Sequence, residues 1–166
     1  MMKKVCLDNQ ILGWGIARSG VANPRDKEVQ AIKFFDELSK NNFIIIIPTI
    51  VLSEFLAPID PRDHDDYILL LSEYAQFSTF DIDSSKILAK ILYEKYDALK
   101  EIQTIGKIPK QKLKVDVQIV ATALANECDE IYSEDEEIPK IAEGYIASKK
   151  MIDLIPEQEQ LFEDSE

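Results

Sequence analysis

Apolar residues along this chain alternate between short β-branched runs and stretches with helical spacing. The clearest run covers residues 43–47 and predicts a strand buried on both faces. Shorter apolar runs predict four further strands at 3–8, 77–82, 130–132 and 151–155. Asn41 and Asn42 mark a turn before the strongest strand, and Pro48 after it opens a helix.

Helical spacing fills the segments between these strands. Over residues 26–40 the stripe consists of Val29, Ile32, Phe35 and Leu38. Other helices are predicted at 48–57, 65–76, 84–102, 115–126 and 136–144, with a weaker one at 11–18 before a polar loop at 19–25. This order predicts an α/β fold with a short parallel sheet and helices on both faces. Ligands of such sheets bind beyond the carboxyl ends of the strands.

The length of 166 residues suggests one domain, which we place at 1–156, followed by an acidic, frayed tail at 157–166. No apolar stretch reaches the roughly 20 residues needed to span a membrane, and the N-terminus does not resemble a signal peptide. Two cysteines, Cys6 and Cys128, make no disulfide framework. We therefore expect a cytoplasmic protein without a membrane partner.

The formal net charge of −12 argues against broad, nonspecific binding of nucleic acids, which requires a basic surface. The charge also suits a basic partner or simple solubility. The single histidine, His64, lies among aspartates in a polar segment and is expected at the surface. Without further histidines or a cysteine pair at ligand spacing, a zinc site is not expected.

Four acidic residues stand where the predicted fold brings them together. Asp8 and Asp135 follow two of the predicted strands, whose carboxyl ends share one edge of a parallel sheet. Glu54 and Asp116 fall on apolar helix faces, where a carboxylate is out of place. We expect Asp116 in the first turn of its helix, where the helix dipole favours negative charge. Each acid alone has a plainer explanation as a turn, capping or surface residue.

Clustered carboxylates repel one another, and burying them without a partner is costly. A divalent cation is the simplest partner for such a cluster. An oxygen-lined site for Mg²⁺ or Mn²⁺ favours phosphodiester chemistry, because a metal lowers the pKa of bound water and stabilises charge on the reacting phosphate. We expect Asp8, Asp116 and Asp135 to be ligands, while Glu54 either joins them or orients the attacking water.

In this order, the acids and their surroundings resemble the PIN-domain nucleases. The matching stretches are VCLDN at 5–9, PTIVLSE at 48–54, VDVQIVATAL at 115–124 and IYSED at 131–135. The resemblance implies a three-layer α/β/α fold and metal-dependent cleavage of RNA by Asp8, Glu54, Asp116 and Asp135. It also implies pocket support from Ser133, which matches a Ser or Thr of the family, while Asn9 stands where the family often has Thr.

The family members that the resemblance most often implies in bacteria and archaea are VapC-like toxins of toxin–antitoxin pairs. Such a toxin would have an antitoxin protein as partner and RNA as substrate, and many relatives form homodimers. Exposed apolar residues of the helix predicted at 65–76, such as Ile68, Leu69 and Leu71, are candidates for the dimer contact. The loops around 19–27 and 101–114 are longer than in compact toxins.

Four lysines precede Asp116 in a stretch that contains no acidic residue. They are Lys107, Lys110, Lys112 and Lys114. Positive charge beside the pocket would position an RNA backbone, although a solvated loop explains the same residues equally well.

Three other functions compete with the nuclease. A phosphatase of the haloacid-dehalogenase type needs a second Asp two residues after the first, and Gln10 stands there. A receiver domain needs an acid pair after the first strand, which is also missing. The stronger rival is a catalytically inactive PIN-like module for protein interactions, which the acidic surface would suit.

Overall fold

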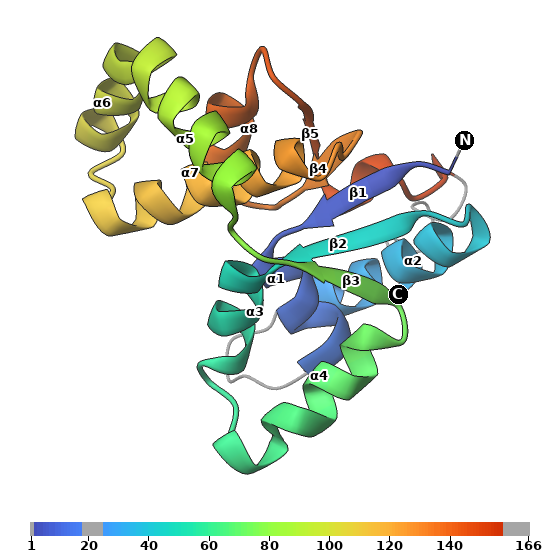
Figure 1. Cartoon of the computed structure of the whole chain (residues 1–166). Coiled ribbons are helices and arrows are strands. Elements are labelled where there is room, and N and C mark those ends of the chain that lie inside the picture. Colours follow the sequence, from blue (N-terminus) through green and yellow to red (C-terminus); the bar gives the residue numbers. More distant parts are fainter. Residues whose placement is uncertain (1, 18–24, 158–166) are drawn as a thin grey trace.

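The computed structural model describes residues 2–17 and 25–157, and the tail predicted at 157–166 lies outside this range except for Glu157. Five strands form one sheet: β1 (Lys4–Leu7), β2 (Ile44–Pro48), β3 (Ala75–Ser78), β4 (Glu130–Tyr132) and β5 (Ala147–Lys149). All neighbours are parallel and the order is β3-β2-β1-β4-β5 (Figure 1). The predicted α/β class is therefore confirmed.

Eight α-helices connect and cover the strands: α1 (Asn9–Leu12), α2 (Arg25–Lys40), α3 (Thr49–Leu56), α4 (His64–Ser72), α5 (Ile82–Glu94), α6 (Tyr96–Ile105), α7 (Lys110–Ala125) and α8 (Glu137–Ala142). A π-helical segment (Gly13–Ala17) and two 3₁₀ turns (Pro61–Asp63 and Met151–Asp153) complete the described part. None of its helices is long and apolar enough to cross a membrane.

The core forms because the strands bury both faces of the sheet. On one face, Phe34 of α2 packs its ring 4.9 Å from that of Tyr132 in β4. On the other face, α7 covers the sheet with fully buried residues such as Val120 and Ala121. α1, α2 and α4 lie on the first side, and α5 and α7 on the second (Figure 1). The helices thus make the two outer layers of a three-layer fold.

The longest predicted helix is two helices in the structure. The prediction placed one helix at 84–102, but α5 ends at Glu94 and α6 begins at Tyr96. Lys95 breaks the helix and donates hydrogen bonds from Nζ to the carbonyl oxygens of Lys140 and Ile141, at 2.9 and 3.1 Å. The ammonium of Lys95 thus satisfies two carbonyl groups at the end of α8 that the helix leaves without partners. This contact stabilises the chain at the break between α5 and α6.

Two predicted strands are misplaced. β3 begins two residues earlier than expected and ends at Ser78, because the Asp81 side chain accepts from the backbone N of Ser84 at 2.8 Å and caps α5. The strand predicted at 151–155 is a 3₁₀ turn. Its place in the sheet is taken by β5, directly before it.

Candidate functional site

The predicted acids meet at the carboxyl edge of the sheet, beside its central strand. Asp8 directly follows β1, and Asp135 follows the adjacent β4 by three residues. The strand order reverses at this pair, with β2 and β3 on one side and β5 on the other. This is the position where ligands bind to open parallel sheets.

Ser133 holds two of the acids in place. Its Oγ donates to Asp8 Oδ2 at 2.6 Å and accepts from the backbone N of Asp135 at 3.0 Å. The backbone N of Asn9 donates to Asp8 Oδ1 at 2.7 Å. Burial raises the pKa of Asp8, although the hydrogen bonds from Ser133 and Asn9 oppose that shift. Asn9 thus supports the pocket through its backbone.

Lys112 reaches into the acids from α7. Its Nζ lies 2.6 Å from Asp135 Oδ2, 3.1 Å from Glu137 Oε2 and 3.8 Å from Asp116 Oδ2. Burial works against the charge of Lys112, but the hydrogen bonds to Asp135 and Glu137 hold its pKa above the ordinary value. A lysine ammonium is therefore the cation that these carboxylates contact in this structure.

Asp116 is the least compensated acid of the site. Its Oδ2 is buried and has no hydrogen-bond partner among the described residues, because Lys112 is too distant for a hydrogen bond. Burial, with further repulsion from Asp135 and Asp8, raises the pKa of Asp116 from 3.8 to about 7. The expected place in a first helical turn is wrong, because α7 begins at Lys110 and puts Asp116 in its second turn.

Glu54 stands on α3 at the other side of Asp8. It is half-buried and lines a small cavity of about 170 Å³ together with Asn9 and Trp14. Burial raises the pKa of Glu54, and the negative charge of Asp8 adds to that shift. The two carboxylates are therefore within electrostatic reach of each other.

The chemistry of these side chains fits a hard divalent cation, which prefers carboxylate oxygens. The buried oxygen of Asp116 without a partner fits as well. As the side chains stand, however, no three acidic, histidine or cysteine side chains in the described ranges are grouped tightly enough to hold a metal ion. Lys112 instead lies between the carboxylates of Asp135, Glu137 and Asp116.

The predicted lysine loop is mostly helix. Lys110, Lys112 and Lys114 belong to the first turns of α7, whereas Lys107 lies in the preceding turn with φ at +50°. Helical spacing turns Lys112 toward the acids and puts Lys110 and Lys114 on another side of α7, where they line a separate groove. The four lysines therefore do not form one surface.

One further residue of the site escaped the sequence argument, and the expectation for His64 needs a correction. Glu137 joins the site through its contact with Lys112, and its backbone N donates to Asp135 Oδ1 at 2.9 Å. A carboxylate two residues after Asp135 was the available signal. His64 is half-buried, and its Nε2 lies 3.1 and 3.0 Å from the carbonyl oxygens of Leu56 and Ile59, so its role is structural.

No protein-family model matches the sequence, and no curated protein matches it. Among solved structures, the chain is similar to a chain of VapBC2 from Rickettsia felis, whose crystal structure contains a DNA fragment from the promoter. The likeness covers 89% of this chain and 98% of that one, with a TM-score of 0.58 and 14% sequence identity. At this identity, the comparison shows a shared fold.

Proposed function

We propose that this chain is a metal-dependent endoribonuclease with its active site at the carboxyl edge of β1 and β4. The observation that carries the proposal is the convergence of Asp8, Asp116 and Asp135 beside β1, with a buried and unpartnered oxygen on Asp116. Buried acids with a purely structural role are rarely left so poorly compensated.

Asp8, Asp116 and Asp135 would hold Mg²⁺ or Mn²⁺. When bound, the ion supplies a water of lowered pKa and stabilises negative charge on the phosphate. Ser133 keeps Asp8 and Asp135 in fixed orientations through its two hydrogen bonds. Glu54, with its raised pKa and its place within electrostatic reach of Asp8, is suited to orient the attacking water or to accept a proton from it.

Of the four lysines, Lys107 best matches the RNA contact predicted for a loop, since it is exposed and lies in a turn before α7. Lys110 and Lys114 would contact the RNA only if the bound RNA also extended over their side of α7. Lys112 would meet the substrate phosphate itself, because its ammonium already lies between the acids.

We further propose that the nuclease is the toxin of a toxin–antitoxin pair and forms a homodimer. The sequence resemblance to VapC-like proteins and the structural likeness to a chain of a VapBC2 complex support this assignment. An antitoxin would be a separate protein, and its identity is tested by purification from cells that express both chains.

A catalytically inactive PIN-like interaction module is the second candidate. The observation in its favour is Lys112, which already neutralises part of the acidic cluster. Such a module has no use for a metal ion at Asp116.

Incubation of structured and unstructured RNA with Mn²⁺, Mg²⁺ or EDTA tests the proposal. We expect cleavage that requires a metal and disappears in Asp116→Asn, while Asp97→Asn, a change at an exposed position of α6, cleaves normally. Calorimetry with Mn²⁺ alone separates the two candidates. Neither cleavage nor metal binding would support the inactive module and contradict the nuclease.

A further inference from the structure

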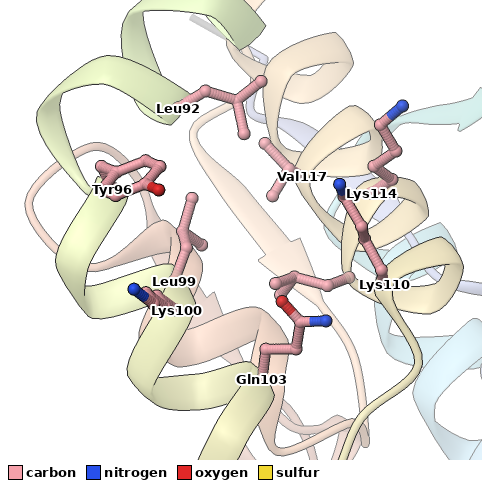
Figure 2. Close-up of a pocket in the computed structure, with 9 residues that line it drawn as sticks. Leu92, Tyr96, Leu99, Lys100, Gln103, Lys110, Lys114 and Val117 are labelled. Carbon is pink, nitrogen blue, oxygen red and sulfur yellow. The ribbon is translucent and has the colours of Figure 1, made fainter.

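A groove runs between α6 and α7, on a different side of α7 from the acidic site. Its volume is about 380 Å³ (Figure 2). The apolar lining residues are Leu92, Tyr96, Leu99, Leu113 and Val117. Leu92 and Tyr96 are exposed, whereas Leu99, Leu113 and Val117 are buried and form its floor. An apolar groove of this kind is a common place for a helix of a partner to bind.

Positive charge surrounds this groove. Lys100 stands on α6, and Lys110 and Lys114 stand one turn apart on α7, on the opposite side of the groove (Figure 2). No acidic residue lines the groove, and none of the three ammonium groups makes an ion pair with a described residue. In a chain with a net charge of −12, such an uncompensated basic rim predicts an acidic occupant.

The same chain carries a helix with the complementary pattern. α4 exposes Leu69 and Leu70 to 65% and 40%. Asp65 and Asp66 precede these leucines by one turn and Glu73 follows them by one turn, and all three acids are exposed. None of these acids makes an ion pair with another described residue. Leu71, predicted for the dimer contact, is instead buried, so the exposed leucines are Leu69 and Leu70.

We propose that α4 of a second copy of this chain binds in the groove between α6 and α7. Leu69 and Leu70 would cover the apolar floor of the groove. Asp65 and Asp66 would lie against Lys110 and Lys114. Asp65 stands four positions before Leu69, Asp66 stands four positions before Leu70, and the two lysines stand four positions apart, so each acid shares a side of α4 with its leucine and the lysines share a side of α7. The inference rests on the homodimer of the proposed function but does not depend on nuclease activity.

The contact joins two different surfaces, so a closed dimer requires that it occur twice around a two-fold axis. Each copy then gives one α4 and receives another. The reciprocal arrangement also doubles the buried area, which for a specific interface is at least about 1,200 Å². An RNA strand fits the groove less well, because its lining is mainly aliphatic and contains a single aromatic side chain, Tyr96.

Charge reversal on each surface tests the contact with the full chain. Lys110→Glu with Lys114→Glu makes the groove acidic, and Asp65→Lys with Asp66→Lys makes α4 basic. All four positions are exposed, so the variants are expected to fold as the original chain does, which circular dichroism checks. The matched control is Lys86→Glu with Lys90→Glu, an exposed pair one turn apart on α5 that does not line the groove.

Sedimentation over a concentration series gives the readout. We expect a dimer for the original chain and for the α5 control, and at least about tenfold weaker dimerisation for each charge-reversed variant alone. In an equimolar mixture of the two variants, each acidic groove meets a basic α4, and dimers are expected to return. A monomeric original chain, dimers that tolerate both reversals, or a mixture that fails to pair would each overturn the proposal. A monomer would leave the groove to RNA or to another protein.

Discussion

Helix α7 faces two sites that treat charge in opposite ways. Toward the sheet edge, Lys112 and Asp116 belong to a cluster in which one ammonium group forms ion pairs with three carboxylates. Toward α6, Lys110 and Lys114 line a groove in which no acid balances them. Residues of like charge, only two positions apart in the sequence, therefore have different partners. Helical geometry alone separates them, since each residue turns about 100° from the last.

The difference shows that burial determines which partner a charged side chain favours. The acidic cluster is largely enclosed, so its charges shift one another's pKa values and favour a bound cation. The groove is open to solvent and no acidic residue lines it, so its lysines favour an acidic surface. The following changes separate the two sites.

The largest effect is expected at the acidic cluster. Asp116→Asn removes one charge from the proposed metal site and is expected to lower RNA cleavage by about 100-fold or more, as loss of a preorganised charge typically does. A gel assay with Mn²⁺ measures this loss, and sedimentation should show the same dimer as before. Equal loss of dimerisation would mean that the two sides of α7 are not independent.

Replacing the lysine of the cluster should strengthen metal binding. In Lys112→Met no ammonium competes for Asp135 and Glu137, and like charge within a few ångströms costs about 1–4 kcal/mol at a partly exposed site. Calorimetry with Mn²⁺ is expected to show at least tenfold tighter binding. Lys110→Met, on the groove side of the same helix, is the matched control and should bind Mn²⁺ as the original chain does.

Removing the hydroxyl that supports the site should weaken the fold. Ser133→Ala breaks the bond to Asp8 and the bond from the Asp135 backbone, and leaving buried groups unpaired costs about 1–3 kcal/mol. Urea unfolding measures the loss. Ser85→Ala removes an exposed hydroxyl that donates to the Asp81 carbonyl and should cost much less.

The raised pKa of Asp116 predicts a pH-dependent stability. Its proton is held more tightly in the folded state, so the stability that Asp116 contributes when protonated is lost as the pH rises from 3.8 to about 7. Melting temperatures of the original chain and of Asp116→Asn should therefore agree near pH 4 and separate up to pH 7, with the variant more stable. A constant difference across this window would contradict the shift.

The smallest effect on the fold is expected in the groove. Tyr96 is 65% exposed, so Tyr96→Ala should change the unfolding free energy by about 0.5 kcal/mol or less. Dimerisation should still weaken, because the proposed contact loses an apolar wall. Urea unfolding and sedimentation of the same sample show whether the two quantities separate as expected.

Much of the fold was predictable because strands buried on both faces are continuous runs of apolar, often β-branched residues. The run at 43–47 and the acids that follow β1 and β4 led to the right edge of the sheet. β5 escaped because Ala147, Ser148 and Lys149 have no apolar pattern, which suits an edge strand paired on one side only. The apolar run at 151–155 was mistaken for it.

The role of Lys112 was missed because the lysine-rich stretch looked like a loop. Pro109 was an available signal, since proline commonly stands at the start of a helix. With α7 extended back to Lys110, Lys112 and Asp116 fall four positions apart and share one side of the helix. Only three-dimensional packing brings Glu137 to the same ammonium.

The hydrogen bond between Ser133 and Asp8 joins residues separated by 125 positions in the sequence. During synthesis, β1 can pair with β2 once Pro48 has emerged, but β4 begins only at Glu130 and is made much later. A growing chain on the ribosome therefore carries Asp8 long before the residues that orient it exist. The acidic cluster therefore cannot assemble before the residues up to Glu137 have been synthesised.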